Sequence, residues 1–389
     1  MQLTVDDEIL NLFDSINIFQ TRTGMNRKIE PIKRRWKLGD TLNFTPLTKI
    51  EMYSTIASGH DLFSCGSFSS VVSSIGLMSE VGRYTIIASG CSRMGFRHPI
   101  EALSMNSAFF NFARENVHAY FLEYEKKHGA VNKKPVPTPQ PQNQTLTIGN
   151  DVWIGNNVKL TGGITIGTGA VIASNSVVTK SIPPYAIVAG IPAVVKKFRF
   201  NDEIIEDLLK SQWWEYELGD MYKLNFDFST PENFLIDFNE KYHKIRKHSP
   251  KIFYPLQYTL KKNNINITKN MIITHHGTVA FLDQNTGKIN HKSNNYNNND
   301  VVLGYIENNN IFFKLKDKYV CEIDLDGHIK TTSEKKSFAK IEYKNKKYTI
   351  KNNYGFLSAR KNGEFGYINT DKEWEEFIIV SSEFDNSAL

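Results

Sequence analysis

The histidines of this chain are its first candidates for chemistry, because a neutral imidazole is the side chain best suited to removing a proton near neutral pH. His98 is followed by Pro99 and stands where a regular pattern of the sequence is interrupted. His118 lies in an aromatic-rich stretch with a helical pattern, where a surface or packing role explains it better. His98 is therefore the candidate for a general base, with a purely structural role as the alternative.

The cysteines do not indicate a second kind of chemistry. Cys65, Cys91 and Cys321 are far apart and odd in number, which argues against a disulfide framework and against a cysteine-rich metal site. Cys65 and Cys91 also fall within or beside a pattern of small side chains that pack inward. We expect no metal, no nucleophile that forms an acyl-enzyme, and a reducing, cytoplasmic environment.

Charge and hydropathy narrow the class of protein. The 389 residues carry a net charge of +6, spread along the chain, which is too weak to indicate nucleic acid but favours an anionic cofactor or polymer. The N-terminus is acidic where a signal peptide is basic, and no stretch approaches the roughly 20 apolar residues of a membrane span. We predict a globular, cytoplasmic chain with no nucleic-acid partner and no membrane span.

A period of six residues is the strongest structural signal. Aliphatic residues recur every six positions, and a small or β-branched residue stands two positions before each next repeat. Hexads of this kind are typical of a triangular coil in which each hexad forms one flat face. The pattern predicts a parallel β-helix, since ordinary strands alternate with a period of two. The aliphatic positions are Ile148, Ile154, Leu160, Ile166, Ile172 and Val178, and their companions are Val152, Val158, Ile164, Ala170, Ser176 and Ile182.

The same period occurs earlier in the chain and is then interrupted. An excursion over residues 93–147 separates two blocks of coils, holds the helical stretch AFFNFARENVHAYFLEYEKKH and ends in PVPTPQPQNQ. A long interruption of a solenoid is typically a functional loop on one face. The earlier inward positions are Phe63, Ile75, Val81 and Ile87, with Ser67, Ser73, Ser79, Thr85 and Cys91 at the small positions.

Two further parts follow the coil. The stretch NDEIIEDLLKSQWWEYEL predicts a capping helix with Asn201 or Asp202 as its N-cap. Beyond residue 248 the composition shifts to Asn, Lys and aromatic residues, and three units of roughly forty residues fit a β-trefoil. Gly287, Gly327 and Gly363 coincide when these units are aligned. The expected parts are an N-terminal segment (1–60), the β-helix with its excursion (61–200), the helical cap and linker (201–248) and the trefoil-like domain (249–389).

The coil sequence resembles a known family. The segment IGNDVWIGNNVKLTGGITIGTGAVIASNSVVTKSIPPYAIVAGIPAVV is similar throughout to the hexapeptide-repeat acyltransferases. The segment RYTIIASGCSRMGFRHPIEALS resembles their xenobiotic and polysaccharide acetyltransferase branch, which places a His-Pro pair where the coil is interrupted. The resemblance implies a left-handed parallel β-helix, acetyl-CoA as acetyl donor, and a homotrimer. The last C-terminal unit resembles the repeats of fascin-like and lectin-like trefoils.

The resemblance also implies roles for individual residues. His98 would activate an acceptor hydroxyl for direct attack on the thioester, and the backbone amide of Asn156 would stabilise the developing oxyanion. Lys196, Lys197 and Arg199 would meet the phosphates of the nucleotide, although a solvated basic tail explains them nearly as well.

The expected cofactor contacts follow from the same resemblance. Ala173 and Ser174 stand where many relatives carry Gly-Ala, which is a local departure from the family pattern. The matching positions are Trp153, Gly163, Ser174, Thr179 and Lys180.

The predicted function is O-acetylation of a carbohydrate hydroxyl, of a bacterial capsular or other surface polysaccharide. The appended trefoil-like domain favours a polymer acceptor, because a second binding module raises its local concentration. Acetylation of a small antibiotic is an alternative, as is N-acetylation of a sugar. A structural or glycan-binding β-helix that is not an enzyme is the remaining alternative, and it predicts no binding of CoA.

Overall fold

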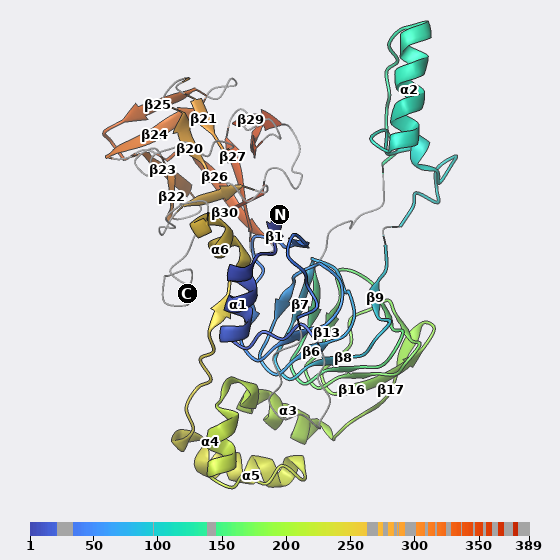
Figure 1. Cartoon of the computed structure of the whole chain (residues 1–389), viewed down its shortest axis with the longest axis vertical. Helices are drawn as coiled ribbons and strands as arrows, with labels where there is room; N and C mark the ends of the chain where they lie inside the picture. The colour runs from blue at the N-terminus through green and yellow to red at the C-terminus, as the bar shows by residue number, and fades with distance from the viewer. Residues whose placement is uncertain are drawn as a thin grey trace. The chain divides into compact units, whose positions relative to one another are not determined.

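The computed structural model describes most of the chain, which divides into two compact units (Figure 1). One unit is Val71–Lys247, and the other combines Met1–Ser70 with His248–Leu389. The described residues are 1–21, 34–95, 97–137, 145–262, 271–274, 279–283, 286, 288–291, 301–307, 310–315, 317–323, 328–335, 337–344, 347–352, 355–359, 365–368 and 376–379.

The unit Val71–Lys247 contains a triangular coil of short parallel strands. Strands of successive coils pair in parallel, β10 with β13, β11 with β14 and β12 with β15, so that equivalent residues lie 18 positions apart. Three pairings on three faces, each 18 residues apart, are the geometry that the hexads predict, and the parallel β-helix is confirmed. The strands are β10 (Leu146–Ile148), β11 (Trp153–Ile154), β12 (Lys159–Leu160), β13 (Thr165–Ile166), β14 (Val171–Ile172) and β15 (Val177–Val178).

The core of the coil consists of the predicted hexad positions. Every aliphatic position from Ile148 to Val178 is buried, and so are all their companions from Val152 to Ile182. The fainter early period is confirmed as well, because its aliphatic, aromatic and small positions from Phe63 to Cys91 are all buried. Asn157 and Asn175 take the corners with positive φ, a conformation that Asn tolerates better than most residues.

The excursion separates two blocks of coils in the sequence, but the coils before and after it stack directly on each other. Strands β7 (Ser79–Val81), β8 (Ile86–Ile87) and β9 (Ser92–Arg93) pair in parallel with β10, β11 and β12, although the paired residues are 67 positions apart. The excursion itself contains η1 (Ser107–Phe109) and the predicted helix, α2 (Glu115–His128). The coil therefore resumes in register after the excursion.

A hairpin and a group of helices end this unit. Strands β16 (Ala186–Gly190) and β17 (Ala193–Phe198) pair antiparallel. The side chain of Asn201 accepts a hydrogen bond from Ile204 N at 2.9 Å, so Asn201 is the N-cap of α3 (Asp202–Ser211), as predicted. The elements η2 (Trp213–Glu215), α4 (Leu218–Lys223), α5 (Pro231–Lys241) and η3 (Tyr242–Lys244) follow. An apolar cluster joins this cap to the coil and contains Tyr185, Leu208, Met221, Phe226, Phe234, Leu235, Phe238 and Ile245.

The other unit begins with short elements. Parallel pairing of Ile50 with Cys65 links β3 to β5, ahead of residue 61, where the prediction begins the coil. The elements are β1 (Gln2–Thr4), α1 (Asp7–Ser15), β2 (Thr41–Asn43), β3 (Ile50–Glu51), β4 (Thr55–Ile56), β5 (Ser64–Cys65), β6 (Ser70–Val71, which straddles the unit boundary), β18 (Ile252–Phe253) and α6 (Pro255–Lys262).

The C-terminal part of the same unit is built from antiparallel strands. Hairpin pairs such as β22·β23 and β26·β27 enclose a core that includes Val302, Phe313 and Phe377. The repeat glycines Gly287, Gly327 and Gly363 lie outside the described residues, and the trefoil stays a prediction. The strands are β19 (Ile272–Thr274), β20 (Phe281–Asp283), β21 (Lys288–Asn290), β22 (Leu303–Glu307), β23 (Asn310–Leu315), β24 (Lys318–Ile323), β25 (Ile329–Thr332), β26 (Ala339–Lys344), β27 (Lys347–Asn352), β28 (Gly355–Ala359), β29 (Phe365–Ile368) and β30 (Glu376–Ile379).

Candidate active site

His98 lies in the excursion, shortly after β9, and its ring orientation is fixed by a backbone carbonyl. Nδ1 of His98 lies 2.6 Å from the carbonyl oxygen of Met105. A carbonyl oxygen only accepts, so Nδ1 carries the proton and donates, and Nε2 of the neutral ring keeps a free lone pair. The exposed ring also meets Phe110 edge to face, with 5.4 Å between the ring centroids. This tautomer is the one that a general base requires.

A turn brings the two partners of this hydrogen bond together. Pro99 is buried, and its carbonyl oxygen accepts a hydrogen bond from Ala102 N at 3.1 Å. The chain therefore reverses immediately after His98, and Met105 returns to face the imidazole. The His-Pro pair thus marks a local structure that positions the ring, which is a physical reason for the pattern seen in the sequence.

Asn156 and Ser174 are brought together in neighbouring coils. The backbone N–H of Asn156 donates to Oγ of Ser174 at 3.1 Å, and its side-chain Nδ2 donates to Oγ of Ser89 at 2.9 Å. Gly155 makes this approach possible, because a Cβ there would lie 2.6 Å from Ser174 Oγ and 2.7 Å from its backbone nitrogen. The amide predicted to stabilise an oxyanion is therefore engaged by a hydroxyl predicted to contact the cofactor.

Trp153 lies on the outward face of one sheet of the coil. It pairs with Ile86 on β8 and with Val171 on β14. The Trp153 side chain is 57% exposed and that of Ile86 is 43% exposed. Val194, on β17 of the same sheet, is 51% exposed. These side chains form an apolar strip on the surface of the coil.

The remaining predicted cofactor residues are exposed at coil corners and strand ends. Gly163 has a φ of +76°, which suits its corner position. Thr179 and Lys180 follow β15 directly. Lys196 and Lys197 are exposed on β17. All of these residues are accessible to a ligand that runs along the outside of the coil.

Arg199 differs from the two lysines, because the structure gives it intramolecular partners. Its guanidinium forms an ion pair with Asp151 at 2.8 Å, donates to the carbonyl oxygen of Gly169 at 2.9 Å, and lies over the ring of Tyr185. Burial raises the pKa of the Asp151 carboxyl, and the ion pair with Arg199 partly opposes that rise. Arg199 therefore supports the end of the coil, and its contact with a cofactor phosphate stays a prediction.

Sequence reasoning missed Ser89, Met105 and Asp151. Ser89 is 67 positions before Asn156, and the excursion hides the coil spacing that relates them. Both residues stand two positions after a buried isoleucine of their hexad, Ile87 and Ile154, and these isoleucines pair in adjacent coils. Met105 contacts His98 through its backbone carbonyl, in an irregular turn, and Asp151 contacts Arg199 through a carboxylate at a corner of the coil. No sequence pattern indicates either group.

Within the described residues, no group of three or more His, Cys, Asp or Glu side chains is arranged to hold a metal ion. In that same part of the chain, no helix combines the length and the apolar composition needed to cross a bilayer.

The coil matches a known sequence family. Residues 146–180 match the family model described as bacterial transferase hexapeptide (six repeats). This stretch begins at β10 and ends just after β15, so it covers the coils that follow the excursion.

Curated relatives match the same region. A probable macrolide acetyltransferase of Lysinibacillus sphaericus is 45% identical over 114 residues, which are 29% of this chain and 63% of the relative. A chloramphenicol acetyltransferase of Klebsiella aerogenes is 56% identical over 71 residues, 18% of this chain and 34% of the relative. The galactoside O-acetyltransferase of Escherichia coli (strain K12) is 46% identical over 59 residues, 15% of this chain and 29% of the relative.

These matches are partial. The chain spans less than two thirds of the length of each of these relatives, and most of the chain lies outside the matched stretches. The matches show that the coil is similar to the hexapeptide transferase model and to named acetyltransferases.

Proposed function

We infer that the coil belongs to a hexapeptide-repeat acetyltransferase. On that premise, we propose that this chain is an acetyl-CoA-dependent O-acetyltransferase with His98 as its general base. The hydrogen bond from His98 Nδ1 to the Met105 carbonyl carries the proposal, because it leaves Nε2 ready to accept a proton. Nε2 takes the proton of the acceptor hydroxyl as its oxygen bonds to the acetyl carbon. The same proton is then available to the sulfur that departs.

The coil provides groups that fit the donor. Acetyl-CoA, when bound, supplies the acetyl group as a thioester and a thiolate as leaving group. Ser174 Oγ accepts from Asn156 N–H and still has its own O–H to donate, so the pair can support an oxyanion. The exposed lysines Lys196 and Lys197 suit the nucleotide phosphates. Trp153, Gly163, Thr179 and Lys180 complete the proposed contacts.

The proposed acceptor is a carbohydrate hydroxyl, of a capsular or other surface polysaccharide. A relative of the coil is named as a galactoside O-acetyltransferase, and the separate antiparallel C-terminal part is suited to holding a polymer. The second candidate is a small antibiotic, because several relatives of the coil are named for macrolides or chloramphenicol.

Release of free CoA thiol from acetyl-CoA tests the function directly. We expect wild-type protein to release thiol in the presence of a polysaccharide or an oligosaccharide from a panel of bacterial glycans. Turnover with macrolides or chloramphenicol alone would favour the second candidate. No turnover with any acceptor, together with no shift in melting temperature on adding CoA, would overturn the enzymatic proposal in favour of a structural β-helix.

We also propose that the chain assembles as a homotrimer through the apolar strip of Ile86, Trp153 and Val194. We expect Ile86→Glu to lower the mass in light scattering from three chains to one, because a charge replaces an apolar side chain that is 43% exposed in one chain. Thr165→Glu is the matched control, since Thr165 is also exposed but lies on β13, in another sheet. A wild-type monomer, or a trimer that survives Ile86→Glu, would contradict the proposed interface.

A further inference from the structure

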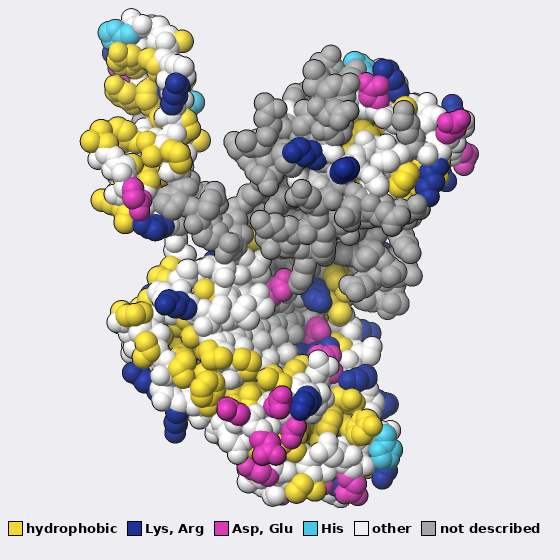
Figure 2. All heavy atoms as spheres, turned by 180° about the vertical axis from the view of Figure 1, so that it is seen from behind, with side chains coloured by type: hydrophobic (Ala, Val, Ile, Leu, Met, Phe, Trp, Pro, Cys, Tyr) yellow, Lys and Arg dark blue, Asp and Glu magenta, His cyan; other side chains and the backbone are white. Residues whose placement is uncertain are grey.

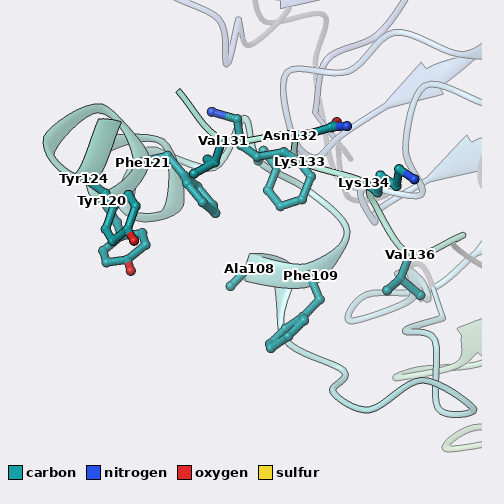
Figure 3. Close-up of a pocket in the computed structure, with 11 residues that line it drawn as sticks. Ala108, Phe109, Tyr120, Phe121, Tyr124, Val131, Asn132, Lys133, Lys134 and Val136 are labelled. Atoms are coloured by element: carbon teal, nitrogen blue, oxygen red, sulfur yellow. The ribbon is translucent and has the colours of Figure 1, made fainter. Parts of the chain in front are cut away.

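The excursion contains an open cleft of its own. The cleft has a volume of about 400 Å³ and lies between one side of α2, η1 and the segment that returns toward the coil (Figure 3). This volume is near the lower end of small-molecule sites, roughly 300–1,000 Å³. The lining residues are Ala108, Phe109, Phe112, Tyr120, Phe121, Tyr124, Val131, Asn132, Lys133, Lys134 and Val136.

Helix α2 presents an aromatic stripe to this cleft. Val117, Tyr120, Phe121 and Tyr124 are spaced as i, i+3, i+4 and i+7, which places them on one side of the helix. Of these residues only Val117 is buried, whereas Tyr120 is 58% and Tyr124 is 39% exposed. Figure 2 shows how densely hydrophobic side chains gather on the surface of the excursion. A helix stripe of this kind normally packs against other side chains, so its exposure indicates a binding surface.

Specific hydrogen bonds hold the walls of the cleft in place. Nζ of Lys133 lies 2.5 Å from a carboxylate oxygen of Glu125, and Val131 N donates to the same oxygen at 3.3 Å. The hydrogen bond from Lys133 lowers the pKa of the Glu125 carboxyl, which stays ionised at neutral pH. Val136 N donates to the carbonyl oxygen of Phe109 at 2.8 Å. The return segment is thus fixed to both α2 and η1, and the cleft is formed before any ligand enters.

The chemistry of the lining favours a sugar ring. The rings of Tyr120 and Tyr124 are 5.9 Å apart and inclined by 34°, and both remain partly exposed although Tyr124 also packs on His128 at 4.6 Å and Tyr120 on Phe121 at 5.3 Å. A pyranose has a face of C–H groups that stacks on such rings, and an edge of hydroxyls that needs polar partners. The phenolic hydroxyls lie at the end of the cleft formed by α2, and the exposed polar side chains of Asn132 and Lys134 line it from the return segment (Figure 3). An apolar drug would gain little from an open cleft with this polar edge.

We propose that this cleft binds a sugar ring of the acceptor by stacking on Tyr120 and Tyr124. The proposal rests on the carbohydrate acceptor proposed above and gives that acceptor a binding site on the excursion, which also carries His98. The cleft holds the sugar but takes no part in proton transfer, so it determines acceptor affinity and specificity.

The test asks whether sugar binding needs the aromatic ring faces of Tyr120 and Tyr124 or only apolar side chains at these positions. Tyr120→Leu with Tyr124→Leu keeps apolar volume and a good helix former but removes both ring faces, whereas the Tyr→Phe pair keeps them. With methyl galactoside, methyl glucoside and maltose as probes, saturation-transfer NMR should show Kd raised about tenfold by the Leu pair and raised less by the Phe pair, which keeps both ring faces and loses only the hydroxyls. Leu122→Ala is the control, since Leu122 is 57% exposed on α2 but does not line the cleft.

The outcomes distinguish this inference from the proposed function. An unchanged sugar Kd in the Leu pair, or no sugar binding by wild-type protein, would overturn the inference. A change in mass in light scattering without a change in sugar binding would also overturn it, and would assign the cleft to a second copy of the chain. Sugar binding that responds to the Tyr variants without any release of CoA thiol would overturn the acetyltransferase and retain the cleft.

Discussion

Replacement of His98 by alanine is expected to lower the rate of acetyl transfer about 10²- to 10⁴-fold, which is the usual contribution of a positioned general base. The loss should appear in kcat, because His98 acts on the proton of the acceptor and not on the donor. The dissociation constant of CoA, measured by titration calorimetry, should stay within about twofold of wild type. Free thiol release at saturating acetyl-CoA measures the rate.

Two further variants separate the base from the fold around it. His98→Asn can still donate to the Met105 carbonyl through its amide, so it should preserve the turn while losing Nε2. It should therefore be as inactive as His98→Ala. His118→Ala, in α2, should retain activity because that exposed ring has no proposed role. Activity in His98→Asn comparable to wild type would show that His98 only shapes the turn.

Replacement of Gly167 by alanine should destabilise the coil by about 1–3 kcal/mol, the usual cost of inserting a methyl group where there is no room. A Cβ at Gly167 would lie 2.7 Å from the carbonyl carbon of Pro183 and 2.7 Å from Cα of Pro184. These are backbone atoms of the next coil, which also holds Gly167 N through the carbonyl oxygen of Ile182 at 2.8 Å. The two coils would have to separate locally.

The free energy of unfolding, measured in urea at a fixed protein concentration, checks this expectation. Gly219→Ala is the matched control, because a Cβ there has no neighbour within 4 Å and the residue lies in α4, where alanine is favoured. Equal stability of Gly167→Ala and Gly219→Ala would mean that the coil spacing can relax around a methyl group.

The coil was predictable because one physical requirement repeats along it. Each hexad turns a single side chain inward, so Ile154 and Ile172 occupy equivalent buried positions and the sequence shows their period directly. The N-cap at Asn201 was also predictable, because a short polar side chain before an amphipathic stretch can accept a hydrogen bond from a backbone N–H that the first helical turn leaves unpaired.

The site was less predictable because its contacts join residues with no fixed spacing. The sequence predicts His98 as the base, but the ring nitrogen that carries the proton is inferred from a contact with a carbonyl in an irregular turn, which no sequence pattern reveals. Lys197 and Arg199 are similar in the sequence, yet only Arg199 has a carboxylate partner, Asp151. The cleft beside α2 depends on tertiary hydrogen bonds of Glu125 and Phe109, which no periodicity reveals.

The way in which the excursion is inserted into the coil determines which parts of the chain can vary independently. Strands on either side of it stay in register although 67 positions, rather than 18, separate paired residues. The pairing of β9 with β12 fixes only where the excursion leaves and re-enters the coil, so the length and content of the excursion can change while the coil stays in register. If the proposed roles hold, donor binding by the coil and acceptor preference of the excursion can change independently.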